Sequence, residues 1–251
     1  MTKWTFFGRV LPERVPLTWD TPLEGSARFA GATFNYRVII HASQAIVDLA
    51  VKNRDPDVFT LRNAAADCIR TITDLVGYKQ GCCFDVEVVA AVCRDTNDWT
   101  VFGIEIPVLA TRRNAGRVGT IDHELLKKAA QTVAVRIALA EFREAMRVPV
   151  GTGFHCYRAT EAMMQSMKAS PDDADGPAWE LLRERLRIDR SAIDEVKKHA
   201  DFPRHGKPSE MSDAERAKVF EITDEIIERF LIYLVNGKTA LTESDFPVLA
   251  S

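Results

Sequence analysis

Apolar residues in the second half of this 251-residue chain recur at the spacing of an α-helix. The first apolar stripe begins beyond Ile121 and ends before Pro149, and similar stripes continue toward the C-terminus. Side chains three and four residues apart lie on one face of a helix, so this period predicts a second half built of helices alone. The residues of the first stripe are Leu126, Ala129, Val133, Ile137 and Ala140.

Proline, serine and acidic residues divide this half into separate helices. An acidic loop at 170–176 separates a helix that starts near Phe154 from one whose first turn holds Pro177. Ser191 and Ser212 each precede an acid by three residues, the capping-box pattern of a helix start. The last helix is apolar over a face too wide for a surface helix, which predicts a central position and, on part of that face, a contact with a second subunit. Its apolar residues are Val219, Phe220, Ile222, Ile226, Ile227, Phe230, Leu231 and Leu234.

The first half of the chain alternates apolar and polar residues at the period of a β-strand. Alternation over Phe29–Ile40 and Ala45–Val51 predicts one pair of strands, and alternation within 84–106 predicts a hairpin. Between the two pairs, Asp57 can cap a helix that Gly77 can end. Strands that flank one helix indicate a sheet with the helix covering one face.

The two patterns meet in a segment rich in glycine and arginine. Thr111–Gly119 lacks periodicity and therefore predicts a domain boundary. Trp4–Val10 adds an edge strand to the first half. We therefore predict an α+β chain, in which residues 1–112 form a mixed sheet with a covering helix and residues 118–251 form a helical bundle.

Charge and cysteine content limit the classes of partner. With 33 Lys and Arg against 36 Asp and Glu, the net charge of -3 does not attract a polyanion, so any RNA contact must come from a local patch. The sequence has no secretory signal and no apolar run long enough to cross a membrane, which predicts a cytoplasmic protein without membrane contact. Five cysteines without CxxC spacing predict reduced thiols and neither metal nor cofactor, although Cys82 and Cys83 could form a redox or metal element.

One local basic patch lies between two predicted helices. Lys197–Lys207, called here the basic junction, holds four cations and two histidines in a stretch that Pro203 and Gly206 interrupt. Metal-independent RNA cleavage needs such groups: a base, an acid, and a cation for the developing charge. Lysines at a helix C-terminus also offset the helix dipole, and proline and glycine also mark simple turns. Composition leaves both interpretations open.

The helix that starts near Phe154 carries three polar side chains within one turn. Tyr157, Arg158 and Glu161 lie close enough for Glu161 to pair with Arg158, and the pair could face the basic junction. The alternative is a half-exposed salt bridge beside a packed tyrosine, which would contribute little to stability.

Short motifs in the second half resemble those of HEPN-type domains, the small helical bundles of prokaryotic toxins and defence systems. The resemblance covers Ile121 to Val235 and includes a third helix that carries a tryptophan. The motifs that carry it are Phe154–Met164, Arg204-His205-Gly206 and Ser212–Arg216. In catalytic HEPN ribonucleases, an arginine and a polar residue precede a histidine by a few residues, and dimerisation brings two motifs together. Arg204 and His205 match the first two positions, and no histidine follows His205, so the motif is degenerate.

The resemblance implies an RNA-associated protein of a prokaryotic toxin or phage-defence system, with two alternatives for its activity. The first is a metal-independent endoribonuclease, in which His205 or His199 replaces the missing histidine. The second is a non-catalytic regulatory protein that dimerises through the last helix and binds a partner or small ligand with its first domain. The catalytic candidates are Arg204, His205 and His199, the RNA-binding candidates are Lys197, Lys198, Lys207 and Arg158, and the supporting candidates are Tyr157 and Glu161.

Overall fold

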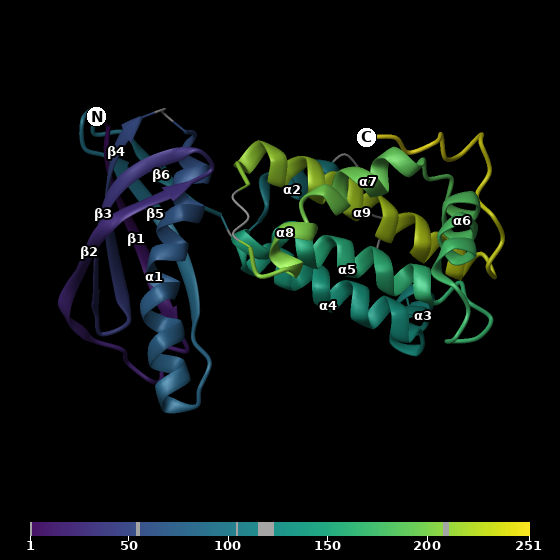
Figure 1. Ribbon diagram of the computed structural model, residues 1–251, viewed down its shortest axis with the longest axis horizontal. Helices are drawn as coiled ribbons and strands as arrows, with labels where there is room; N and C mark the ends of the chain where they lie inside the picture. The colour runs from purple at the N-terminus through teal and green to yellow at the C-terminus, as the bar shows by residue number, and fades with distance from the viewer. Residues whose placement is uncertain (1, 54–55, 104, 115–122, 208–210) are drawn as a thin grey trace. The chain divides into compact units, whose positions relative to one another are not determined.

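The computed structural model divides the chain into a sheet unit and a helical unit (Figure 1). The described residues are 2–53, 56–103, 105–114, 123–207 and 211–251. The sheet unit comprises Met1–Ile104 and Glu210–Asp213, and the helical unit comprises Glu105–Ser209 and Ala214–Ser251. This division confirms the predicted α+β class, with strands in the first part of the chain and helices in the second.

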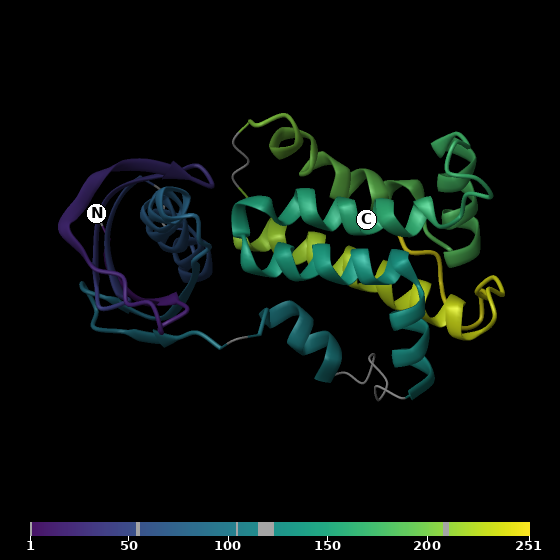
Figure 2. The same ribbon diagram turned by 90° about the horizontal axis from the view of Figure 1, so that it is seen from below.

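The sheet unit is a six-stranded sheet in the order β2-β3-β4-β1-β5-β6. Each pairing among its described residues is antiparallel, a point that alternation alone leaves open. The sheet curls around a long helix, α1 (Val58–Gln80), which covers one of its faces (Figure 2). The strands are β1 (Lys3–Leu11), β2 (Trp19–Phe29), β3 (Ala32–His41), β4 (Gln44–Asn53), β5 (Asp85–Cys93) and β6 (Trp99–Val101).

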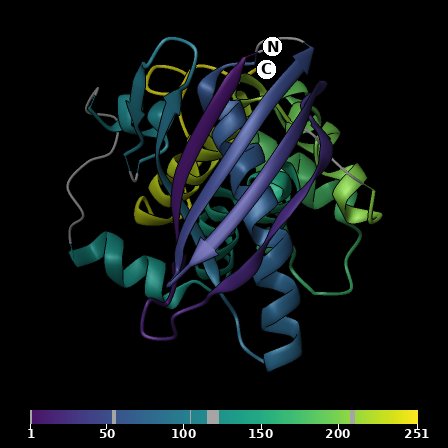
Figure 3. The same ribbon diagram turned by 90° about the vertical axis from the view of Figure 1, so that its left-hand side faces the viewer.

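Alternation along the strands sorts side chains between the two faces of the sheet. Phe6 of β1 lies opposite Val47 of β4, which lies opposite Val38 of β3, and all three are fully buried. The buried face of α1, with Leu61 and Ile69, completes this core. The opposite face of the sheet, which is toward the viewer in Figure 3, is not covered by α1.

Several predictions for the sheet unit need correction. Asp57 caps α1 as predicted, with its Oδ1 2.9 Å from the backbone nitrogen of Thr60, but the helix ends at Gly81 rather than at Gly77. Strand β1 is an interior strand between β4 and β5, not an edge strand. Strand β6 ends at Val101, so the predicted alternation toward residue 106 does not continue as strand, and β2 was not predicted.

The helical unit is built around α9 (Asp213–Val235). Phe220 of α9 packs edge to face on Phe142 of α4, with ring centroids 5.6 Å apart. Arg216 of α9 donates from Nε to Thr152 Oγ1 of α5 at 2.7 Å. The other helices are α2 (Pro107–Asn114), α3 (His123–Gln131), α4 (Val133–Arg147), α5 (Thr152–Gln165), α6 (Asp175–Leu186), α7 (Arg190–Lys198) and α8 (Asp201–Arg204). None of the described helices is both long and apolar enough to cross a bilayer.

Helix boundaries in this unit confirm some predictions and correct others. Helix α9 begins directly after Ser212, as predicted. Helix α7 is capped two residues before Ser191, because Asp189 Oδ1 accepts from the Ser191 backbone nitrogen at 2.8 Å. The predicted first long helix is divided at Thr132 into α3 and α4. Residues 111–114 of the predicted boundary segment belong to α2, and residues 115–119 lie outside the described residues.

The wide apolar face of α9 is used within the unit itself. Of its eight predicted apolar residues, all except Leu231 are buried, and Val219, Phe220 and Ile226 are fully so. The predicted central position of α9 is confirmed. Its apolar width therefore no longer indicates a subunit contact, because contacts inside the unit account for it.

Candidate functional site

The basic junction follows the end of α7 and includes the short helix α8. Lys197 and Lys198 form the last turn of α7, where their charges offset the helix dipole. The chain turns at Gly206, whose φ of +68° is in the left-handed region. The exposed side chains of the junction include Lys197, Lys198, Arg204, His205 and Lys207.

His199, by contrast, points into the helical unit and is only 9% exposed. Its Nε2 is buried without a hydrogen-bond partner in the described part of the chain, 3.7 Å from Glu195 Oε1. Its backbone packs on α5 so closely that a Cβ at Gly153 would lie 2.5 Å from the His199 carbonyl oxygen. Burial lowers the pKa of His199, and Lys198 lowers it further. His199 is therefore buried, whereas Arg204 and His205 of the same junction are exposed.

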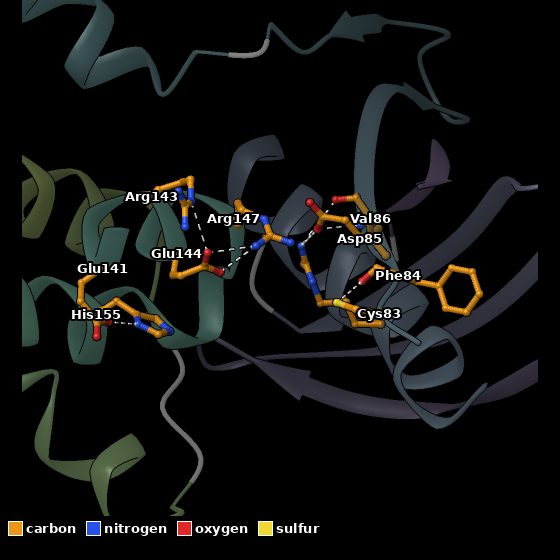
Figure 4. Close-up of polar contacts among 10 residues, drawn as sticks. Cys83, Phe84, Asp85, Val86, Glu141, Arg143, Glu144, Arg147 and His155 are labelled. Carbon is orange, nitrogen blue, oxygen red and sulfur yellow. Dashed lines mark hydrogen bonds and ion pairs between the residues drawn. The ribbon is translucent and has the colours of Figure 1, made fainter. Parts of the chain in front are cut away.

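Arg158 pairs with a residue that the sequence did not suggest. Its Nε lies 3.0 Å from Oε1 of Glu141 on α4. Figure 4 shows the other contact of this carboxylate, in which His155 Nδ1 lies 2.7 Å from Glu141 Oε2. Burial alone would raise the pKa of Glu141, but the hydrogen bonds from His155 and Arg158 outweigh it and lower that pKa. Arg158 thus belongs to a cluster between α4 and α5, in which its ion-pair partner is Glu141 rather than Glu161.

Tyr157 and Glu161, one turn apart on α5, both lie within range of the positive charge of Arg204. Burial raises the pKa of Glu161, and the positive charges of Arg204 and Arg158 act against this increase. Burial also raises the pKa of Tyr157 to about 12, with a further contribution from Glu161. The hydroxyl of Tyr157 is therefore protonated at neutral pH and can donate a hydrogen bond, but it is a poor general base.

A pocket of about 270 Å³, called here the α5–α7 pocket, joins two of the predicted residues, Tyr157 and Lys197. The ring of Tyr157 stacks on Trp179 of α6, with centroids 6.0 Å apart and planes 19° apart. Arg183 of α6 and Arg190 of α7 also line the pocket. Three helices therefore bring an aromatic pair and three cations to one hollow.

The charges of the α5–α7 pocket leave a positive balance. Three cations line it against two acids, Glu180 and Asp194. Arg190 pairs with Asp194 at 3.3 Å, but both side chains are more than half exposed, so the pair is weak and can open. An anionic ligand can replace the Asp194 carboxylate at Arg190 at little cost, because exposed pairs contribute about 0–1 kcal/mol.

Sequence reasoning missed three residues of this pocket. Trp179 and Arg183 are four residues apart on α6, and Arg190 and Lys197 are seven apart on α7, so each pair shares one helix face. These spacings were available in the sequence. The approach of α6 to α7 was not, because it depends on packing between helices.

Possible metal ligands do not gather in the described part of the chain. No group of three or more His, Cys, Asp or Glu side chains is arranged there to hold a metal ion. All five cysteines are free thiols, with Cys82 and Cys83 exposed and the other three buried.

Both halves of the chain match family models. Residues 4–102 match the N-terminal domain, and residues 122–235 match the C-terminal domain, of a domain of unknown function, DUF8168. No curated protein and no solved structure matches the chain. Neither family description refers to HEPN domains, so that resemblance stays a prediction.

Proposed function

The chain belongs to the DUF8168 family, and we propose that its helical unit binds single-stranded RNA in the α5–α7 pocket without cleaving it. The arrangement of Tyr157, Trp179 and Lys197 carries this proposal, because it combines an aromatic surface with positive charge. Proteins that bind single strands use this combination: bases stack on aromatic rings, and cations contact the phosphates. The prokaryotic defence setting and the cytoplasmic location stay predictions.

The concave shape of the pocket favours a single strand over a duplex. Trp179 and the cations lie in a hollow, and a base can enter a hollow only when it is unstacked and unpaired. Exposed cations of the basic junction, such as Lys198 and Lys207, continue from Lys197 along the chain. A strand that leaves the pocket past Lys197 would therefore meet further positive charge on its phosphates.

The positions of the histidines favour binding without cleavage. A general base must lie within hydrogen-bond reach of the proton that it removes. His199 is buried, whereas Arg204 and His205 are exposed. With His199 turned inward, the junction offers His205 alone as an exposed histidine, whereas cleavage of RNA uses both a base and an acid.

The proposal is tested by fluorescence anisotropy of a labelled single-stranded RNA titrated with the full chain. Trp179→Ala is expected to weaken binding by about 1–3 kcal/mol, roughly 5- to 150-fold, because base stacking contributes this much per base. Lys197→Glu is expected to weaken binding as well. Lys127→Glu on α3 makes the same change in charge at an exposed lysine outside the pocket and serves as the control. Equal affinities for the wild type and Trp179→Ala would contradict the proposal.

A separate assay distinguishes binding from cleavage. The same RNA is incubated with the wild-type chain in EDTA, and its length is followed on a denaturing gel. We expect the RNA to remain intact. Cleavage that disappears in both Arg204→Ala and His205→Ala would instead support the endoribonuclease alternative, with those two residues as its site.

A further inference from the structure

The face of the sheet that α1 leaves uncovered carries a row of apolar side chains across five neighbouring strands. The register places Ile39 of β3 beside Ile46 of β4, and Ile46 beside Phe7 of β1. Phe7 in turn lies beside Ala90 of β5, and Ala90 beside Val101 of β6. These five residues are called here the outer apolar row. They alternate with buried residues such as Phe6 and Val47, so they lie on the face opposite α1, and Figure 3 shows that face of the sheet toward the viewer.

Solvent reaches much of this row. Val101 is 81% exposed and Ile46 is 38% exposed. Trp99 of β6, two residues before Val101, is 64% exposed and stacks on Phe7 with ring centroids 5.5 Å apart. An antiparallel sheet with one covered face ordinarily presents polar side chains on the other. A continuous apolar band that is exposed at Ile46 and Val101 and half-buried at its other residues is therefore a departure that marks an interaction surface.

On one side of the outer apolar row, the arginines pair with acidic side chains. Arg94 contacts Asp48 at 3.0 Å, and Thr5 Oγ1 donates to the same carboxylate at 2.7 Å. Arg37 pairs with Glu24 at 3.0 Å. Both arginines have an acidic partner, so among the charged side chains that gather here with Lys3 the balance is a single positive charge.

The rim on the other side of the row is also mixed in charge. Arg9, two residues beyond Phe7 on β1, lies 3.7 Å from Glu13 and opposite Glu87 of β5. An apolar centre within a polar rim of both signs is the usual anatomy of a protein interface. The surface therefore suits a protein rather than a nucleic acid.

We propose that the outer apolar row is a dimer interface, in which the sheets of two copies of this chain pack face to face about a two-fold axis. A two-fold interface requires a surface that is complementary to itself. Both rims carry arginine and acid, so either rim of one copy can face either rim of the other with opposite charges in contact. Apolar side chains of two such sheets interdigitate in a layer about 10 Å thick.

Sedimentation velocity of the full chain over a wide range of concentration tests this proposal. The wild type is expected to sediment with twice the mass of one chain. Val101→Glu and Ile46→Glu are expected to shift it to a single chain, because each would place a carboxylate in the apolar layer. Tyr78→Glu, at an 80% exposed aromatic residue on α1, makes a comparable change outside the row and should remain dimeric.

Hydrogen exchange of wild-type β6 provides a readout that does not depend on a variant. Protection of 99–101 is expected to rise with protein concentration. A wild type that is monomeric throughout, or a dimer that both charged variants leave unchanged, would overturn the proposal. Protection of β6 that does not change with concentration would assign the row to a contact within one chain. Loss of RNA binding in Val101→Glu, with the sedimenting mass unchanged, would assign the outer apolar row to RNA binding. Concentration-independent protection of β6 and this loss of RNA binding would each overturn the proposed dimer interface.

Discussion

The α5–α7 pocket and the outer apolar row both combine aromatic rings with arginines, but they differ in how the charges are balanced. In the described part of the chain, Lys197 and Arg183 of the pocket make no ion pair with an acid, and Arg190 makes only an exposed one. Along the row, Arg37 and Arg94 are held by carboxylates. A surface suited to phosphates thus differs from one suited to protein in whether its cations are paired with carboxylates, rather than in how many cations it has.

The largest expected difference between the two surfaces is in how salt concentration changes RNA binding and dimerisation. About three pocket cations on a single strand predict a slope of roughly -2 for log K against log salt, so RNA binding should weaken about twentyfold between about 50 and about 200 mM salt. Dimerisation should change far less, because the arginines of both rims already pair with acids. Anisotropy and sedimentation across this range provide the measurement. If RNA binding and dimerisation depended equally on salt, the proposed difference between the two surfaces would be wrong.

The two histidines of the basic junction should contribute differently to the pH dependence of the free energy of unfolding. Because burial lowers the pKa of His199, protonation favours the unfolded chain. Neutral His199 therefore contributes its full share of stability above the ordinary histidine pKa of about 6.5. As the pH falls below this value, the free energy of unfolding decreases by at most about 1.4 kcal/mol per pH unit. Urea unfolding across this range measures the slope. His199→Gln should flatten it, and His205→Gln, at an exposed position, should leave it unchanged. A slope unaffected by His199→Gln would contradict the buried role.

Arg158 should show the smallest effect and thereby define the limits of the pocket. It lies outside the α5–α7 pocket, and its pair with Glu141 is half exposed on the arginine side. Arg158→Gln is therefore expected to change RNA affinity by less than about twofold and stability by less than about 1 kcal/mol. Arg183→Gln, the matched change inside the pocket, should weaken RNA binding several-fold. An equal loss in both variants would extend the binding surface onto the α4–α5 face.

The sequence predicts the helices and strands themselves better than it predicts which of them lie side by side. Strict alternation identified β3 and β4, and helical spacing with Asp57 as cap identified α1, because both signals are local. Strand β2 was missed because its inward positions include Gly25, whose missing side chain leaves room for the Tyr36 ring across the strand. Alternation also could not show that β1 lies inside the sheet, since strand order is not a local property.

The candidate site was predicted in part. The basic junction and Tyr157 were identified from residue type and spacing, and Lys197 and Tyr157 do line one pocket. The inward turn of His199 could not be predicted, because it depends on the close approach of its backbone to Gly153 on α5. Trp179 was noted only as part of a helix, since its stacking on Tyr157 requires α6 to pack beside α5.

The most direct test of the central claim is the fluorescence of Trp179 during RNA binding. The chain has four tryptophans, and Trp179 is the one in the helical unit. In a variant with Trp4→Phe, Trp19→Phe and Trp99→Phe, the emission therefore reports on the pocket alone. We predict quenching that saturates with the same affinity as the anisotropy of the labelled RNA. Binding by anisotropy with unchanged Trp179 emission would place the RNA elsewhere and contradict the account.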